Sequence, residues 1–284
     1  MWVLYTIAAT LALSLSVVFA KCGSKKADSS VITALRTLVV VIFMWVFIFV
    51  NDLDAYIPAI GGTSFLYLIL SGLALFGAIL CYHISLRSGS VTGVSALEKL
   101  TTVLMIAAIF ISKYTADYYI QIICIVLIAV GIILVITKRA RSGGSKWILF
   151  GILSALASVA TYLLADFGVS VKSSILSLTL MLTVVLVASL VAVFIRGLQH
   201  GIGKIPMSEF MFIILSGLAA GLGWLCFRTA YIDGHTNTVL AITSMTVATS
   251  PALAALFLKE KVSWKSICGI LLIITGTLMY VFMV

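Results

Sequence analysis

The sequence predicts an all-α integral membrane protein of ten transmembrane helices, arranged as two inverted five-helix repeats. Three observations lead to this prediction. Hydrophobic residues make up 63% of the 284 residues and charged residues only 10%, whereas an ordinary soluble domain has roughly 25% charged residues. The apolar residues fall into ten runs, each long enough to cross a bilayer. The chain also aligns with itself, without a gap, at an offset of 145 positions.

The composition excludes a soluble fold and narrows the choice of partners. A net charge of +9 would suggest nucleic-acid binding in a soluble protein. Most basic residues here lie in short gaps between apolar runs, where they act as topology signals, so we expect a lipid bilayer and no nucleic acid. The five cysteines form no CxxC motif or Cys/His cluster and are interpreted as small hydrophobic residues. We therefore predict no metal site and no cofactor.

The ten predicted spans follow from the length that a bilayer requires, about 20 apolar residues per helix. Pro58 and Pro206 fall in the connecting loops, as expected of residues that break helices. The first run has no Lys or Arg before it and a matching segment recurs in mid-chain, so we interpret it as a retained helix rather than a signal peptide. The predicted spans are Trp2–Ala20, Val31–Val50, Ser64–Leu86, Val91–Ser112, Tyr118–Thr137, Lys146–Ala165, Ser174–Ile195, Glu209–Tyr231, Thr236–Leu258 and Ser263–Val284.

The internal repeat divides the chain into residues 1–139 and 146–284, joined by a linker at 140–145. The segment Leu70–Ala74 is identical to Leu215–Ala219, and nine of the 25 positions from 70 to 94 are identical to their partners. Each unit has five spans, an odd number, so the second unit must enter the membrane in the opposite sense. Inverted repeats of this kind are typical of secondary transporters, which bind substrate between the repeats.

A family resemblance comes from the last two spans. The segment from Ser244-Met245 to Pro251-Ala252-Leu253-Ala254-Ala255-Leu256-Phe257-Leu258-Lys259-Glu260-Lys261 is followed by Cys268-Gly269-Ile270 and Thr275-Gly276. It resembles the ninth and tenth helices of the drug/metabolite transporter superfamily, EamA type. The resemblance extends over the whole chain through the duplicated five-helix unit, and it implies a ten-helix transporter.

The chain departs from the family pattern at several positions. Glu260 keeps an acidic residue, but Thr115 stands at the equivalent place in the first unit, and Thr102 and Val247 replace a usual proline. The first helix lacks the glutamate of the small multidrug exporters, since Ser14 and Ser16 are its only polar groups at comparable depth. This difference argues against proton-coupled export of lipophilic cations by the mechanism of those exporters.

Glu98 is the first candidate site residue, because a charged group within a span costs about 2.5–3.5 kcal/mol on insertion scales. Its repeat partner is Thr243, so a cavity between the repeats would be chemically asymmetric. We expect Glu98 to bind a substrate ammonium group or to carry a coupled proton. Some amino-acid exporters of the superfamily look similar here. The alternative is a structural pair with Lys99 or His83.

His83 and Arg228 occupy equivalent positions near the ends of the third and eighth spans. Arg228 is a candidate to hold a substrate carboxylate, and His83 is a candidate to titrate near neutral pH. The alternative is that both side chains extend to the headgroup region from a helix end.

Aromatic and hydroxyl side chains complete the predicted site. Trp224, Tyr82 and Tyr162 lie on helix faces that would line a central cavity, and the alternative for each is packing or anchoring at the membrane interface. Ser14 and Thr243 are further candidates for substrate binding.

The predicted function is secondary transport of small polar metabolites such as amino acids or related amines, by export or exchange. A flippase of a lipid-linked substrate and a multidrug or cation exporter are the alternatives. No phosphate-binding loop, metal-ligand spacing or catalytic triad is present, so we predict that the protein is not an enzyme. Protons are a candidate coupling ion, and the protein is expected to be a monomer or homodimer.

The basic residues predict the orientation in the cell membrane. The odd-numbered loops, together with the first residues of the spans that follow them, hold thirteen Lys and Arg residues, whereas the four even-numbered loops hold only Lys113 and Lys172. Cytoplasmic loops carry the excess of positive charge, so both termini are predicted to lie outside the cytoplasm. Familiar relatives have both termini in the cytoplasm, which conflicts with this prediction. We follow the charge bias, because it is observed in this chain itself.

Overall fold

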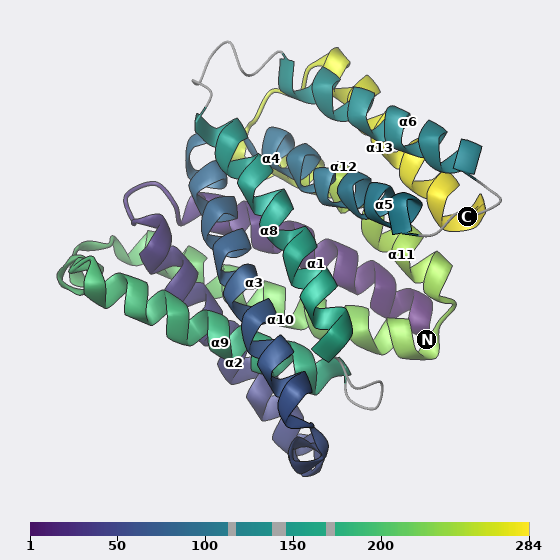
Figure 1. The fold of residues 1–284 in the computed structure, drawn as a ribbon. Coiled ribbons are helices and arrows are strands. Elements are labelled where there is room, and N and C mark those ends of the chain that lie inside the picture. The colour runs from purple at the N-terminus through teal and green to yellow at the C-terminus, as the bar shows by residue number, and fades with distance from the viewer. Residues whose placement is uncertain (113–117, 138–145, 169–173, 284) are drawn as a thin grey trace.

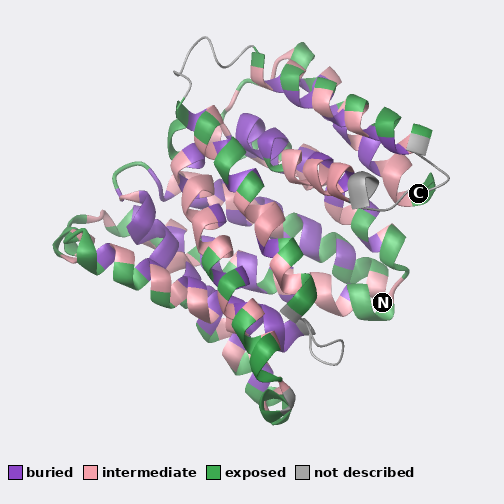
Figure 2. Cartoon of the chain, in the orientation of Figure 1, coloured by how far each residue is buried: buried purple, intermediate pink, exposed green. Residues whose placement is uncertain are grey.

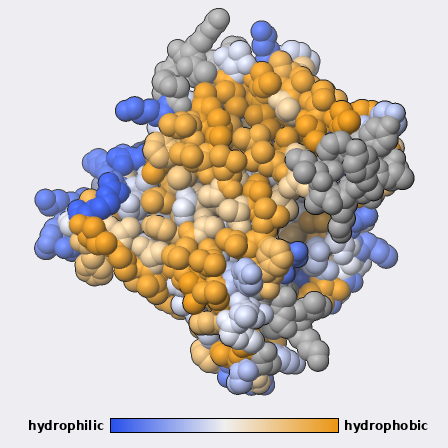
Figure 3. All heavy atoms as spheres, viewed as in Figure 1, coloured by the Kyte–Doolittle hydropathy of each residue, from blue (hydrophilic) through white to orange (hydrophobic). Residues whose placement is uncertain are grey.

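Ten helices of the computed structural model are long and apolar enough to cross a membrane, counted over residues 1–112, 118–137, 146–168 and 174–283, which the structure describes. No strand occurs in these ranges. Both termini lie at the same end of the helix bundle (Figure 1). Hydrophobic residues cover the middle of the face in Figure 3, and hydrophilic residues gather at its margins. The predicted fold class is therefore confirmed.

The helix bounds repeat at the predicted offset. Helices α2 and α9 are 145 positions apart at both ends, and so are α3 and α10. The first half contains α1 (Trp2–Cys22), α2 (Ser29–Val50), α3 (Gly62–Ser88), α4 (Val91–Glu98), α5 (Leu100–Ser112) and α6 (Tyr118–Thr137). The second contains α8 (Lys146–Gly168), α9 (Ser174–Ile195), α10 (Met207–Asp233), α11 (Thr236–Ser244), α12 (Thr246–Leu258) and α13 (Trp264–Met283). The predicted linker at 140–145 lies outside the described residues.

The loops between the second and third spans also repeat. Each contains a short 3-10 helix, η1 (Leu53–Ala59) and η2 (Leu198–Lys204), which the apolar pattern did not predict. Asp52 and Gly197, the residues that precede them, both have positive φ, at 52° and 63°. This left-handed conformation is routine for glycine and more accessible to Asp than to most other residues.

Two spans predicted as continuous are broken, which corrects the sequence-based bounds. The span from 91 to 112 divides into α4 and α5 at Lys99, and the span from 236 to 258 divides into α11 and α12 at Met245. At each break a backbone hydrogen bond spans three residues instead of the four of an α-helix. These bonds run from Lys99 N to Ala96 O (3.1 Å) and from Met245 N to Ile242 O (3.1 Å). Discontinuous helices at the membrane midplane are a feature of transporter binding sites.

The two halves interlock rather than pack as separate bodies. Helix α1 packs against α10 as α8 packs against α3, and α2 meets α9 while α6 meets α13. Glycines permit these close contacts: a Cβ on Gly217 would lie 2.8 Å from Val39, and one on Gly72 would lie 2.7 Å from Val184. Because Gly72 and Gly217 are repeat partners, the same crossing is used twice. Buried residues concentrate where these helices meet (Figure 2).

Candidate functional site

Arg36 places a guanidinium within the membrane-spanning part of α2. Its Nη1 lies 3.0 Å from His83 Nε2, and its Nη2 donates to Ser16 Oγ at 2.8 Å. Ser16 in turn donates to the carbonyl of Ser216 on α10, at 2.8 Å. The arginine thus ties α2 to α1 and α3 through neutral groups. Within the described residues it forms no ion pair at 4.0 Å or less.

Helix α3 contributes Tyr82 and His83, which occupy neighbouring faces. The His83 side chain is 2% exposed, and its Nδ1 lies 2.8 Å from Thr33 Oγ1. The Tyr82 hydroxyl is buried and has no hydrogen-bond partner among the described residues. His83 was predicted from sequence as a candidate that titrates, and the structure buries its side chain in contact with Arg36.

Glu98 ends α4, directly before the break at Lys99. Its side chain is exposed, in contrast to the seven preceding residues of α4, which are all buried. Arg36, Tyr82, Tyr162 and Lys99 all interact with it electrostatically. Since these side chains come from α2, α3, α8 and the break itself, the carboxylate faces the interior of the helix bundle and not the lipid. No ion pair at 4.0 Å or less forms with it in the described part of the chain.

Tyr162 and Arg228 extend the site toward the second repeat. Tyr162 on α8 is 52% exposed and interacts electrostatically with both Glu98 and Arg228. Arg228 on α10 also interacts with Tyr231. Glu98 thus interacts with Tyr82 and Tyr162, and Arg228 is connected to this group of residues through Tyr162.

The other predicted residues have different surroundings. Ser14 is fully buried, and its hydroxyl bonds with Thr249 on α12. The Thr243 hydroxyl donates to the Val239 carbonyl of its own helix at 2.8 Å. The Trp224 ring packs 6.0 Å from the ring of Phe227 and against the hydrophobic cluster of α2 and α9. These three contacts join helices or satisfy local groups, and none of them links the residue to Glu98.

Four buried donors on the helices of this site have no acceptor among the described residues: Arg36 Nε, the Tyr82 hydroxyl, Ser95 Oγ on α4 and Arg228 Nε. A buried polar group normally has a hydrogen-bond partner, so each such group calls for an explanation, such as a bound ligand or water. The site therefore offers one accessible carboxylate and a set of unused donors around it. That combination suits a small molecule with a cationic and an anionic end.

The site is closed at the end of the bundle that carries the basic loops. Trp147 is 2% exposed, and a Cβ on Gly89 or Gly93 would lie 3.0 or 2.8 Å from its ring. Lys21 Nζ donates to the Leu86 and Gly89 carbonyls at 2.6 and 2.7 Å, which caps the end of α3. A cation suits this position because it complements the negative end of the helix dipole.

Glu260 closes the same end from the second repeat. Its carboxylate accepts from Val91 N at 3.1 Å and Thr92 Oγ1 at 3.3 Å, where α4 begins. The repeat partner of Glu260 is Thr115, which lies outside the described residues. The partner of Lys21 is Asp166, so the lysine cap on α3 has no equivalent in the second repeat.

The opposite end is more open. Thr236, Asn237 and Leu240 on α11 are exposed, whereas their partners on α4 (Val91, Thr92 and Ser95) are buried. Trp2, the partner of Trp147, is only half-buried and meets His235 edge to face at 5.8 Å. The structure is therefore sealed on the basic side of Glu98 and looser on the other.

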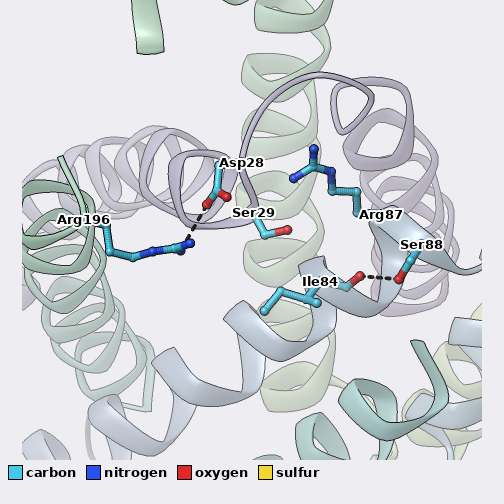
Figure 4. Close-up of a pocket in the computed structure, with 6 residues that line it drawn as sticks. All are labelled: Asp28, Ser29, Ile84, Arg87, Ser88 and Arg196. Carbon is cyan, nitrogen blue, oxygen red and sulfur yellow. Dashed lines mark hydrogen bonds and ion pairs between the residues drawn. The ribbon is translucent and has the colours of Figure 1, made fainter. Parts of the chain in front are cut away.

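A pocket of about 420 Å³ opens at the basic end, away from Glu98. In Figure 4, Arg196 reaches Asp28, at 3.3 Å, while Arg87 stands apart from that pair. Asp28 also accepts from Ser30 N at 2.9 Å and so caps α2. The residues that line the pocket are Asp28, Ser29, Ile84, Arg87, Ser88 and Arg196.

Arg36 is the functional candidate that sequence reasoning missed. The signal was present, because Arg36 falls inside the predicted span Val31–Val50 and a charged residue at that depth needs a reason. Its repeat partner is Met181, so it breaks the chemical symmetry in the way that Glu98 and Thr243 do. The same rule that selected Glu98 would have selected it.

Comparisons with known proteins agree with this architecture. The sequence model of the EamA-like transporter family matches residues 1–137 and 145–282 of this chain. An uncharacterized transporter in the cobO 3′ region of a Sinorhizobium species is 29% identical over 134 residues, which are 47% of this chain and 95% of the relative. A solved crystal structure of a protein has the same fold, with a TM-score of 0.61 and 14% identity over 98% of this chain and 96% of its own. The two matched halves confirm the resemblance drawn from the last two spans: this chain belongs to the EamA-like transporter family.

Proposed function

We propose that this protein is a secondary transporter of a small zwitterionic metabolite, such as an amino acid, in the cell membrane. The observation that carries the proposal is the accessible Glu98 carboxylate at the break between α4 and α5, surrounded by buried donors that lack acceptors. A substrate ammonium group would pair with Glu98. A substrate carboxylate would accept from Arg36, with Tyr82 or Arg228 as further donors.

The asymmetric closure supports alternating access. Helix α4 is buried and fixed by Glu260, whereas the equivalent α11 is partly exposed. If the two repeats exchanged these packing arrangements, the site would open on the basic side and close on the other. Inverted repeats allow such an exchange because each half has the same set of crossings. We propose that the basic end faces the cytoplasm, with both termini on the opposite side.

Replacement of Glu98 by Gln tests the substrate assignment. The variant keeps the size of the side chain but cannot form an ion pair with an ammonium group. Hydrogen bonds to charged groups contribute about 1.5–3 kcal/mol, which corresponds to roughly 10- to 150-fold in affinity. We expect labelled amino-acid uptake into proteoliposomes to fall by that factor or more. Asp233→Asn, at the exposed end of α10, is the matched control and should transport normally.

The same assay separates the competing functions. Unchanged uptake by Glu98→Gln would show that Glu98 has no role in binding. Thermal stabilisation of the purified protein by a lipid-linked sugar, with no response to amino acids or amines, would replace the proposal by a flippase, since a ligand raises stability by mass action.

A further inference from the structure

Two hydrogen bonds define the protonation state of His83. An arginine guanidinium only donates, so His83 Nε2, at 3.0 Å from Arg36 Nη1, must accept. Thr33 Oγ1 donates to the Ser29 carbonyl at 2.8 Å, which leaves it to accept from His83 Nδ1 at 2.8 Å. The ring therefore carries its one proton on Nδ1, and His83 is neutral in this arrangement. This tautomer is assigned from the network of donors and acceptors.

The titratable and charged groups around His83 come from several helices. On its own helix, the centroid of the Tyr82 ring lies 5.9 Å from that of His83, and Arg87 follows one turn later. Helix α9 contributes no titratable side chain, since Ser174–Ile195 contains only apolar residues, Ser and Thr. Among the other packed helices, α2 contributes Arg36, which contacts His83 directly. Lys21 on α1 bonds with the carbonyls at the end of α3, and Glu98 on α4 and Tyr162 on α8 interact with each other, Glu98 also with Tyr82.

We propose that His83 is the proton-binding residue of a proton-for-substrate exchange, which rests on the zwitterion transport proposed above. A second ring proton can only go to Nε2, where it would face the Nη1–H of Arg36 at 3.0 Å. Two donors of like charge cannot share that contact. Proton uptake at Nε2 therefore displaces the guanidinium from His83.

The displaced arginine has one carboxylate within electrostatic reach, that of Glu98. If Arg36 pairs with Glu98, it occupies the group that binds the substrate ammonium. The proton on His83 and the substrate on Glu98 then exclude each other. If the transporter changes its open side only with the proton bound or with the substrate bound, and never with both, it exchanges one proton for one substrate. Because the zwitterion is neutral, each cycle moves one positive charge.

Nitrogen-15 NMR of the purified protein tests the switch without any substrate. The chain has three histidines, so the His83→Gln variant assigns the signal of His83 against those of His200 and His235. At alkaline pH we expect a proton on Nδ1 and a hydrogen-bonded Nε2. On acidification, the imidazolium should form with the same midpoint as a shift of the Arg36 Nε signal. A proton on Nε2 at alkaline pH, or an Arg36 signal that does not respond, would overturn the proposal.

Transport by His83→Gln tests the coupling. The amide can accept from Arg36 and donate to Thr33, but it takes up no proton. We expect exchange of labelled for unlabelled amino acid to continue and accumulation driven by a pH gradient to be lost. His200→Gln, in η2, should retain both activities. If His83→Gln still accumulates substrate in response to a pH gradient, His83 does not carry the proton. If the wild type exchanges no amino acid, the proposed substrate class is wrong, whereas the NMR result still decides whether His83 and Arg36 form the switch.

Discussion

At the scale of single residues, the proposed site consists of positions where the two repeats differ. Glu98 has Thr243 as its partner, His83 has Arg228, and Arg36 has Met181. The backbone crossings around these positions are shared, as Gly72 and Gly217 show. Duplication therefore supplies two copies of one scaffold, and divergence of a few side chains supplies a site with a cationic and an anionic side.

Part of the proposed site could be predicted from the sequence for a physical reason. Glu98 stands out because a carboxylate within an apolar run is costly, and that cost is visible without a structure. The contact between Arg36 and His83 is not visible, because the two residues are 47 positions apart and their approach depends on how α2 packs against α3. Trp224 shows the converse: it lies on a predicted cavity face, and yet it packs against the hydrophobic cluster of α2 and α9.

Arg36→Met separates recognition of the two ends of the substrate. It introduces the residue that the second repeat has at this position, Met181. We expect amino-acid binding to weaken by roughly 10- to 150-fold, because charge-assisted hydrogen bonds of about 1.5–3 kcal/mol are lost. Binding of the corresponding amine, which has no carboxylate, should change little. Equilibrium binding of the two labelled compounds to purified protein measures both effects.

Arg36→Met leaves His83 Nε2 without its donor, and a buried acceptor left without a partner costs about 1–3 kcal/mol, so the free energy of unfolding of the variant is measured alongside binding. Arg196→Met, which removes the surface pair with Asp28, is the matched control and should leave both affinities intact. Equal weakening for the amino acid and the amine would mean that Arg36 shapes the site without binding the carboxylate.

At the scale of helices, length was predictable and continuity was not. Spans such as Tyr118–Thr137 and Ser174–Ile195 agree with the structure at both ends, because the apolar length that a bilayer requires is written directly in the sequence. The breaks at Lys99 and Met245 contain neither Pro nor Gly. Pro251 removes one backbone donor from α12, but it lies six positions beyond the break, and the first repeat has Ile106 there. The breaks therefore depend on tertiary packing.

The crossing of α6 and α13 gives an element-scale prediction. A Cβ on Gly269 would lie 2.6 Å from the Gly131 carbonyl, and a Cβ on Gly131 would lie 2.6 Å from the Gly269 carbonyl. Gly269→Val should therefore force the helices apart and lower the free energy of unfolding by about 1–3 kcal/mol, the usual cost of overpacking. Reversible unfolding in detergent, followed by circular dichroism, measures the change.

Gly77→Ala is the control for that substitution. Gly77 also lies within a helix, but a Cβ there would meet nothing within 4 Å. Alanine should stabilise α3 by about 0.5–1 kcal/mol, since glycine loses more backbone entropy on folding. If the two variants had the same stability, the close approach of α6 and α13 would not limit the fold.

At the scale of the whole molecule, the two halves are joined by contacts that alternate between them. Helix α1 depends on α10, α8 depends on α3, and α6 depends on α13, so a movement of one half changes the packing of the other. Lys21 from the first half and Glu260 from the second hold the junction of α3 and α4 together. Opening at the basic end must therefore break the contacts of Lys21 and of Glu260, so closure at that end depends on both halves of the chain.

The proposed orientation of the molecule rests on the distribution of its basic residues. Thirteen Lys and Arg residues lie in the odd-numbered loops or directly beside them, among them Lys21 and Arg87 at the sealed end. Loops rich in Lys and Arg usually stay in the cytoplasm, so we expect this end to be cytoplasmic and both termini, which follow an even number of spans, to lie outside. Alkaline phosphatase fused after Val284 should therefore be active, and green fluorescent protein at the same place should be dark. Fusions after Arg141, which follow five spans, should give the reverse pattern. Fluorescence at Val284 with an inactive phosphatase would reverse the orientation and make the sealed end of the site the outer one.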